Sequence, residues 1–282
     1  MYAITSILLP VDFSDVAKNA FRYAAGIAAK TGADLNLLYC IPDSSNDDSP
    51  FLIVPYADRL KAAKQDMDKF LYGERQWAME NGITLPSINT KVKGDTLKVA
   101  VEKLVSSQEI NLLVMGTKGR KNEWEKVLGS KTSYLINQAP CPVLVVPADA
   151  QYNPIQRICI ATDLNDESAF EIERVDGMFT PYKPEIHFLH IRIHQDKTTN
   201  YDLNHLREAI AKKHLESTLC FAAVSNSDVV NGLFHYARKQ DCQLVAMYRP
   251  EKTWLARTFK ASSTRDAILK ADLPLLIITN HQ

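Results

Sequence analysis

The sequence predicts an α/β fold made of two doubly wound, parallel-sheet, Rossmann-like domains in tandem. Three observations predict it: apolar runs of strand length alternate with amphipathic stretches of helix length, glycines follow two of these stretches, and the second half of the chain resembles the first. Continuous apolar runs between helices are typical of parallel strands covered on both faces. The 282 residues are enough for about two domains of ordinary size.

The first half alternates regularly between the two kinds of segment. It opens with an apolar run at residues 4–11, which predicts a strand. Residues 15–31 then carry apolar side chains at helical spacing and end before Gly32, a favoured helix C-cap, and Gly82 closes a later and longer helix in the same way. In chain order we expect strand 4–11, helix 15–31, strand 35–41, helix 56–81, strand 87–93, helix 96–107, strand 111–115, helix 130–138 and strand 143–147.

The second half repeats the first. Residues 6–15 align with residues 157–166 at a shift of 151, and the same shift pairs the second apolar run of each half without a gap. Residues 138–146 align with residues 270–278 at a shift of 132, so the second copy is 19 residues shorter in its middle. A repeat of this length indicates two domains of one fold rather than a solenoid, whose repeats are far shorter.

The order of elements in the second half follows the first less regularly. We expect elements at residues 158–162, 167–179, 185–193, 203–216, 219–224, 228–239, 243–247, 262–270 and 275–279. The predicted domains are residues 1–149 and 155–282, with a linker at 151–156 that contains Pro154. Residues 43–55 are polar and irregular, and we expect a loop over the ligand-binding edge of the sheet there.

Composition limits the class of protein. The chain is 46% apolar and 23% charged, as in ordinary soluble globular proteins, and its formal net charge is zero. This balance argues against broad binding to nucleic acid or to an anionic membrane. We expect no signal peptide, because the start of the chain lacks a basic region and a cleavage site, and no membrane span. Five scattered cysteines fit reduced thiols, hence a cytoplasmic location.

The most informative motif consists of Gly-Thr-Lys-Gly at residues 116–119 and, nine residues later, Gly-Ser-Lys-Thr at residues 129–132. An apolar strand precedes it and a predicted helix comes after it. Glycines allow the backbone to approach an anion, and the free amides at a helix N-terminus favour negative charge. Hydroxyl and cationic side chains could add to such a site: Ser130, Thr132, Lys118, Arg120 and Lys131.

Position in the sheet supports a nucleotide phosphate site. Asp12 and Gly116 both lie just past the ends of predicted strands, and doubly wound sheets bind ligands at the carboxyl ends of strands near a switch in strand order. Two simpler interpretations stay open. The glycine loop can be only a tight turn, and Asp12 can be only a helix-capping residue.

The motif resembles that of a known family. The spacing Gly-2x-Gly-9x-Gly-Ser, with an apolar strand before it and Pro-Val-Leu-Val-Val-Pro at residues 142–147 after it, is similar to the ATP-binding motif of the universal stress protein family. Ile-Leu-Leu-Pro-Val-Asp-Phe-Ser at residues 7–14 resembles the first strand and turn of that family. The resemblance extends over the chain as two such domains, and it implies a fold of the adenine nucleotide alpha hydrolase-like class.

The resemblance implies roles for individual residues. Pro10, Val11 and Asp12 would line the adenine and ribose pocket, with Asp12 near the sugar hydroxyls. Cys40 would offer backbone groups to the adenine edge. The ribose would lie on Met115 and Gly116, and the residues around the phosphates would be Gly119, Arg120, Gly129, Ser130, Lys131 and Thr132. The implied ligand is ATP, or ADP or AMP, with Mg²⁺ on the phosphate oxygens.

The second copy departs from this pattern. At the shift of 132, Tyr248 replaces Gly116, and a glutamate and an alanine replace the next two motif glycines. Ser262 and Asp163 are retained. A tyrosine would fill space that the phosphate loop leaves empty, and a carboxylate would repel phosphate. We therefore expect one working site and one degenerate site.

Other candidate ligands receive little support. His187 and His190 alternate along one expected strand and so face opposite sides, which favours ordinary strand histidines over a metal cluster. The sequence contains no Cys-x-x-Cys pair of the kind that binds zinc. The basic stretch at residues 249–260 contains Trp254 and Phe259, and it is either a solvated loop or a surface for an anionic ligand or partner.

Three functions are compatible with these patterns. The first is a regulatory protein that binds an adenine nucleotide in the first domain. The second is a slow ATPase, although beyond Asp12 and Asp15 we find no set of carboxylates near the glycine loop. The third is an interaction scaffold without a ligand. Domains of the resembling family tend to pair through their last strands, so we expect an intramolecular pseudo-dimer built from residues 143–146 and 275–278, with homodimerisation of whole chains open.

Overall fold

The computed structural model describes residues 2–42, 54–108, 110–117, 134–136, 138–162, 168–193, 200–249, 267–268 and 270–279. The elements of the first half are β1 (Ser6–Pro10), α1 (Asp15–Thr31), β2 (Asp34–Cys40), α2 (Tyr56–Glu80), β3 (Ile88–Lys93), α3 (Leu97–Gln108), β4 (Leu112–Thr117) and β5 (Val143–Pro147). The second half contains β6 (Arg157–Ala161), α5 (Ser168–Phe179), the 3₁₀-helix η3 (Thr180–Tyr182), β7 (Glu185–Arg192), α6 (Asn200–Ala211), β8 (Thr218–Ser225), α7 (Val229–Lys239), β9 (Leu244–Arg249) and β10 (Leu275–Thr279).

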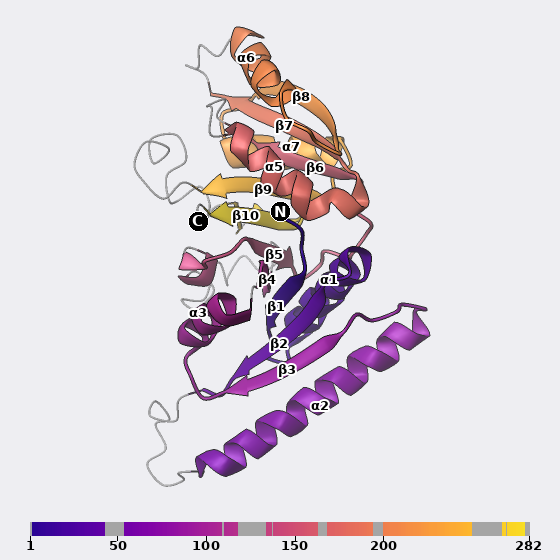
Figure 1. Cartoon of the computed structure of the whole chain (residues 1–282), viewed down its shortest axis with the longest axis vertical. Coiled ribbons are helices and arrows are strands. Elements are labelled where there is room, and N and C mark those ends of the chain that lie inside the picture. The colour runs from indigo at the N-terminus through magenta and orange to yellow at the C-terminus, as the bar shows by residue number, and fades with distance from the viewer. Residues whose placement is uncertain are drawn as a thin grey trace.

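The strands form one sheet in the order β3-β2-β1-β4-β5-β10-β9-β6-β7-β8 (Figure 1). Every neighbouring pair is parallel except β5 and β10, which are antiparallel. The predicted α/β fold with a mostly parallel sheet is confirmed. Counted outward from the β5–β10 pair, each half has the same order of strands, and the order reverses at β1 and at β6.

Strand register recurs between the halves. Ile7 of β1 lies opposite Leu35 of β2. In the second half, Ile158 of β6 lies opposite Ile186 of β7. Each of these two residues is 151 positions after its counterpart in the first pair. The shift found by aligning the sequence with itself therefore also relates the pairing of these strands.

Two hydrophobic clusters cover the two faces of the sheet. We call the side that carries α1, α2, α5 and α6 the first face, and the side that carries α3, α7 and the buried residues Leu135 and Ile136 the second face. Alternate side chains of one strand divide between them, so Ile7 belongs to the first cluster and Leu8 to the second. Both clusters contain residues from both halves, which makes the core continuous across the β5–β10 junction.

Helix α1 forms where the sequence predicts it. Ser14 caps its start by accepting a hydrogen bond from the Ala17 amide, and Gly32 ends it in the left-handed conformation at φ 76°. The apolar side chains between them lie on the side of the helix that faces the sheet, with Ala20 and Phe21 fully buried. This helix positions the loop that connects it to β1.

The predicted helix at residues 203–216 is wrong at both ends. Helix α6 begins at Asn200 and ends at Ala211, and β8 begins soon after it. The buried carboxylate of Asp176 on α5 accepts hydrogen bonds from the amides of Glu216 (3.1 Å) and Ser217 (2.9 Å), at the end of the predicted helix. These bonds hold the chain outside a helical path.

The predicted linker at 151–156 packs partly against the core. Ile155 is 1% exposed. The ring of Tyr152 contacts Tyr23 of α1 edge-on, at 5.4 Å between centroids, and its hydroxyl lies 3.0 Å from the hydroxyl of Tyr182 in η3. Asn19 of α1 also donates to the carbonyls of Pro147 (3.0 Å) and Ala150 (2.9 Å). The chain between the two halves is thus fixed to α1.

Candidate functional site

The sheet topology places a crevice at the carboxyl ends of β1 and β4. These strands are neighbours. After β1 the chain enters α1 on the first face, whereas the helical residues 134–136 beyond β4 lie on the second face. Because the two connections leave toward opposite sides, a gap opens between them, and ligands of doubly wound sheets bind in such gaps. Both predicted anchors of the site, Asp12 and Gly116, lie at this edge.

Asp12 is held in place by the start of α1. One oxygen of its exposed carboxylate accepts hydrogen bonds from the amide (3.1 Å) and the hydroxyl (2.5 Å) of Ser14. Ser14 in turn accepts from the Ala17 amide (3.2 Å), so the carboxylate and the helix cap form one chain of hydrogen bonds. Ser14, rather than Asp12, is therefore the residue that caps α1. No described residue donates to the second carboxylate oxygen of Asp12.

A strained residue comes directly after Asp12. Phe13 has φ 64°, a left-handed conformation that is uncommon for a residue other than glycine. Its ring packs against Tyr39 of β2 at 4.6 Å and Phe70 of α2 at 5.9 Å between centroids. Burial raises the pKa of the Tyr39 hydroxyl, and the Asp66 carboxylate raises it further. No spacing in the sequence indicates this aromatic wall, because its members come from three separate elements.

Val11 and Cys40 complete the side of the crevice next to β2. The Val11 amide donates to the Leu38 carbonyl at 2.9 Å, which extends the β1–β2 pairing beyond the end of β1, and Val11 is 6% exposed. Cys40 is half-buried at the last position of β2 and packs on the second face. The structure therefore brings Pro10, Val11, Asp12 and Cys40 to one edge.

Gly116 has a packing role that the motif alone does not indicate. A Cβ atom at this position would lie 2.6 Å from Val16 Cγ1 and 2.8 Å from the Val16 carbonyl oxygen. Only glycine lets the first turn of α1 lie this close to β4. Close approach of α1, rather than contact with a ligand, is the role of Gly116 that the geometry requires.

The two residues beside Gly116 differ in environment. Met115 is 6% exposed and packs on the second face. The hydroxyl of Thr117, the last residue of β4, is buried and forms no hydrogen bond within the part of the chain that the structure describes. A buried hydroxyl without a partner costs stability unless a ligand or water satisfies it.

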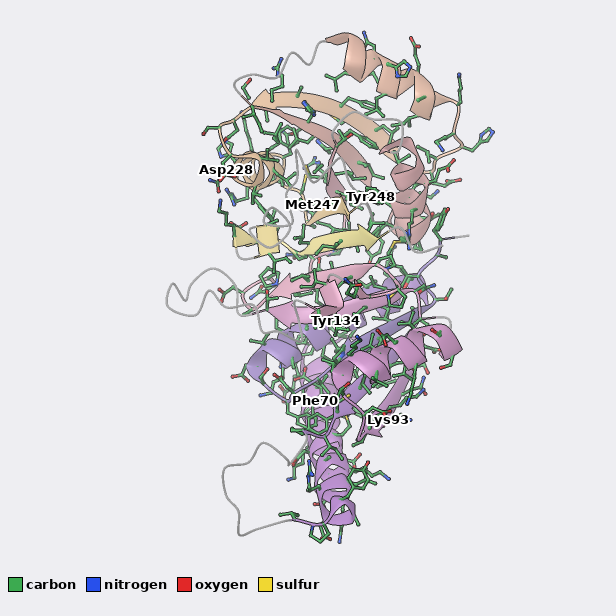
Figure 2. The ribbon with its side chains drawn as sticks, turned by 90° about the vertical axis from the view of Figure 1, so that its left-hand side faces the viewer. Phe70, Lys93, Tyr134, Asp228, Met247 and Tyr248 are labelled. Carbon is green, nitrogen blue, oxygen red and sulfur yellow. The ribbon has the colours of Figure 1, made fainter. Side chains whose placement is uncertain are left out.

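Most of the predicted phosphate residues lie outside the described part of the chain: Gly119, Arg120, Gly129, Ser130, Lys131 and Thr132. The description resumes at Tyr134, two residues beyond the motif. The Tyr134 hydroxyl donates to Glu102 Oε1 at 2.9 Å, and the Lys98 ammonium group lies 4.4 Å from the centre of the Tyr134 ring. These contacts hold Tyr134, which is labelled in Figure 2, against α3 on the second face.

The second half places a tyrosine where the first half has Gly116. Gly116 lies opposite Val146 across β4 and β5. Tyr248 of β9 lies opposite Ile278 of β10. Each of these two residues is 132 positions after its counterpart, Gly116 or Val146. The half-buried Tyr248 ring packs against the cluster on the first face, next to the labelled Met247 in Figure 2. Asp163, Ser262 and the basic stretch from residue 250 onward lie outside the described residues.

The two strand histidines have separate partners. His187 Nδ1 lies 3.1 Å from the Tyr236 hydroxyl of α7, and His190 Nδ1 lies 3.0 Å from the Thr162 carbonyl oxygen. Across the described ranges, no group of three or more His, Cys, Asp or Glu side chains is arranged to hold a metal ion. Nor does any helix in those ranges have the length and apolar character needed to cross a membrane.

The fold is that of a doubly wound α/β protein with a crevice at the switch in strand order. The model of the universal stress protein family matches residues 3–147, and the chain belongs to that family. Similar relatives include universal stress protein Sll1388 of Synechocystis, 30% identical over 50% of this chain and 96% of its own length. Another is universal stress protein MJ0531 of Methanocaldococcus jannaschii, 28% identical over 50% of this chain and 80% of its own length.

Solved structures show the same fold over nearly the whole chain. A universal stress protein from Archaeoglobus fulgidus has a TM-score of 0.70 with 15% identity, covering 97% of this chain and 98% of its own. Protein PA1789 of Pseudomonas aeruginosa, described as functionally unknown, has a TM-score of 0.59 with 20% identity, covering 99% of this chain and 94% of its own. At these identities the likeness concerns the fold alone.

Proposed function

We propose that this protein binds an adenine nucleotide in the crevice between β1 and β4 and acts as a regulatory protein of the stress response. Membership of the universal stress protein family supports the stress-response role. The observation that carries the nucleotide site is the placement of Asp12, whose exposed carboxylate is fixed by Ser14 where adjacent strands connect to opposite faces. The glycine motif begins at the end of the second of these strands.

The described residues fit the nucleoside part of such a ligand. The second oxygen of Asp12 is oriented by the bonds of the first and would accept hydrogen bonds from ribose hydroxyls. Val11 and Met115 supply apolar surface at the ends of their strands, and main-chain groups at Cys40 would meet the adenine edge. The Thr117 hydroxyl, which has no hydrogen-bond partner among the described residues, would gain one from the ligand.

The glycine motif would hold the phosphates. Its main-chain amides, with the side chains of Arg120, Ser130, Lys131 and Thr132, would contact phosphate oxygens, and Mg²⁺ would be held through those oxygens. This part of the proposal rests on motif spacing and on family membership. ATP, ADP and AMP differ only in this part of the ligand, so the motif would set the preference among them.

We further propose one working site in each chain, within an architecture of two stress-protein units at residues 1–149 and 155–282. The second unit would lack the phosphate site, because Tyr248 brings a ring to the position of Gly116. The antiparallel β5–β10 pair, with Leu276 opposite Leu144, would act as the junction of an intramolecular pseudo-dimer. Reduced cysteines in this architecture are in keeping with a cytoplasmic protein.

Equilibrium dialysis with radiolabelled ATP and Mg²⁺ tests the nucleotide site. Asp12→Asn keeps an oxygen that can accept from Ser14 but removes the charge, so it should weaken binding about tenfold without unfolding the protein. Asp34→Asn is the matched control, because this exposed carboxylate lies at the first position of β2, at the opposite end of the strand from the crevice. Equal affinity of the wild type and Asp12→Asn would argue against the site.

Hydrolysis is tested in the same samples by phosphate release. A regulatory binding protein should release phosphate no faster than the Asp12→Asn variant at saturating ATP. Sustained turnover that depends on Asp12 would instead favour the slow ATPase. Complete absence of ATP, ADP and AMP binding in the wild type would favour the scaffold without a ligand.

A further inference from the structure

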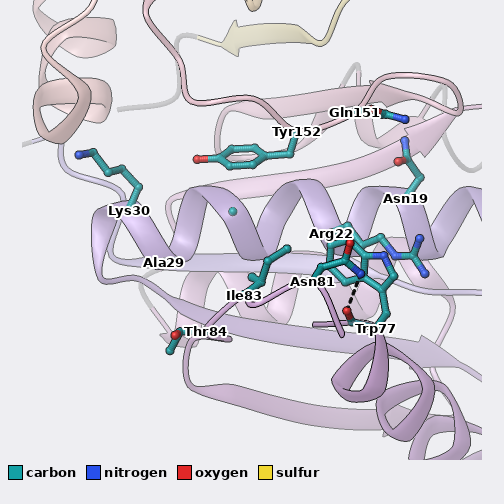
Figure 3. A pocket seen from close by; sticks show the side chains of 11 residues that line it. Asn19, Arg22, Ala29, Lys30, Trp77, Asn81, Ile83, Thr84, Gln151 and Tyr152 are labelled. Carbon is teal, nitrogen blue, oxygen red and sulfur yellow. Dashed lines mark hydrogen bonds between the residues drawn. The ribbon is translucent and has the colours of Figure 1, made fainter. Parts of the chain in front are cut away.

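A groove of about 690 Å³ runs along the outer side of α1, away from the candidate nucleotide crevice (Figure 3). Its floor is α1 from Asn19 to Lys30. The end of α2 with the turn after it forms one wall, and residues 151–152 form the other. We refer to it as the α1 groove. Its volume lies within the range of pockets that bind small organic molecules.

The wall made by Tyr152 is rigid. A Cβ atom on Gly26 would lie 2.5 Å from the Tyr152 ring, so the absence of a side chain at Gly26 lets the ring lie directly on α1. The hydrogen bond to Tyr182 (3.0 Å) and the edge contact with Tyr23 fix the ring from the far side. A preformed aromatic surface of this kind loses little conformational entropy when a flat ligand binds to it.

The opposite wall is also aromatic and fixed. The Arg22 guanidinium stacks on Trp77 at 4.3 Å from the ring centroid and forms two hydrogen bonds to Glu74, at 2.8 and 3.2 Å. Glu74 is 2% exposed, so it balances the charge of Arg22 beneath the surface. Ile83 adds apolar surface that is 37% exposed to solvent.

The charge of the groove is positive at one end. Lys30 is exposed, with its ammonium group 5.9 Å from the centre of the Tyr182 ring. Among the residues that the structure describes, no carboxylate lines the groove. Figure 3 shows Lys30 at one end, Arg22 and Trp77 at the other, and Tyr152 and Ile83 between them. A ligand with a flat apolar body and one negative group matches this distribution.

We propose that the α1 groove binds planar aromatic carboxylates of about two fused rings. The rings would lie over Ala29, between Tyr152 and Ile83, and the carboxylate would pair with Lys30. This site is separate from the proposed nucleotide site, since it uses the outer side of α1 and the connection between the two halves of the chain.

Binding of 2-naphthoate to the whole protein, measured by saturation-transfer NMR, tests the proposal. Ala29 is exposed, so Ala29→Trp should fill the groove without disturbing the core and should abolish binding. Lys30→Met should weaken binding about fivefold, as expected for an exposed ion pair, and so should replacing the ligand by neutral 2-naphthylmethanol. Lys64→Met, on an exposed part of α2 outside the groove, is the matched control and should bind like the wild type.

Three results would overturn the proposal. They are no saturable binding of 2-naphthoate to the wild type, equal binding to Ala29→Trp and wild type, or equal affinity for the neutral and charged ligands. Circular dichroism of each variant verifies that it is folded. If Ala29→Trp fails to fold, the comparison of Lys30→Met with Lys64→Met still decides the outcome.

Discussion

Val16 and Gly116 lie in such close contact that no side chain fits between them: a Cβ atom on Gly116 would come within 2.8 Å of the Val16 carbonyl oxygen. The contact joins the first turn of α1 to the end of β4. It therefore sets the distance between the two connections that enclose the candidate nucleotide crevice. The same glycine that opens the phosphate motif in the sequence also fixes the helix whose cap holds Asp12.

Gly116→Ala should destabilise the protein by about 1–3 kcal/mol, because the added methyl group must displace the backbone of α1. The measurement is the free energy of unfolding from urea titrations. Gly73→Ala is the matched control, since Gly73 lies inside α2, where an added Cβ would meet no other described part of the chain within 4 Å beyond the adjoining helix backbone. That change should stabilise the protein by up to about 1 kcal/mol through helix propensity. Equal and small effects at both glycines would contradict the packing role.

Arg22→Met should destabilise the protein by about 2 kcal/mol, because it leaves the buried carboxylate of Glu74 without its partner. The double variant Arg22→Met/Glu74→Met should regain most of this loss, since the unpaired charge is then gone. Lys69→Met breaks the exposed pair with Asp66 and should change stability by less than about 0.5 kcal/mol. A double variant less stable than Arg22→Met would contradict this account.

Asp228 should contribute a stability term that depends on pH. It caps α7 by accepting from the Asn231 amide (2.9 Å), and it pairs with Lys270 (2.8 Å). The hydrogen bond from Lys270, with help from the Asn231 amide, lowers the pKa of this carboxyl below its usual 3.8. A lowered pKa in the folded state means that the contribution is complete above the unfolded value and is lost as the pH falls through the folded value.

Asp228→Asn tests this sign. Asparagine also caps helices well, so the variant removes the charge and keeps the cap. The stability difference between wild type and variant should be present at pH 7 and should shrink as the pH falls below 3.8 and through the lowered pKa of the folded state. Urea unfolding at several pH values measures it. A difference that grows on acidification would contradict the assignment.

Cysteine labelling should distinguish the crevice from the core. Burial raises the pKa of the Cys141 thiol to about 12, so iodoacetamide should modify it only after unfolding. Cys40 is half-buried at the end of β2 and should react in the native protein. Because the proposed nucleotide lies on this strand end, saturating ATP should slow labelling of Cys40 and leave Cys141 unchanged. Peptide mass spectrometry measures both rates, and ATP-independent labelling of Cys40 would count against the site.

Much of the fold was predictable because local patterns agree with it. The apolar runs predicted as strands form the largely buried strands β1, β2 and β5. Gly32 ends α1, as the sequence indicates. Parallel pairing was predictable because these runs are continuously apolar, which is typical of strands covered on both faces. The path of the chain at Glu216 and Ser217 was not predictable, because it depends on the carboxylate of Asp176, which is distant in sequence.

The candidate site was predictable in part. Strand-end positions brought Asp12, Cys40 and Gly116 to one edge as expected, because parallel strands share their carboxyl edge. The aromatic wall of Phe13, Tyr39 and Phe70 was missed, since long-range packing leaves no spacing signal in the chain. The steric role of Gly116 was missed for the same reason.

The number of nucleotides bound by each chain tests the central claim most directly. Isothermal titration of the whole protein with ATP and Mg²⁺ should give one site, and Gly129→Asp should abolish it, because a carboxylate would then lie where the motif meets phosphate. No heat up to about 1 mM ATP, two equal sites, or unchanged binding by Gly129→Asp would contradict the account.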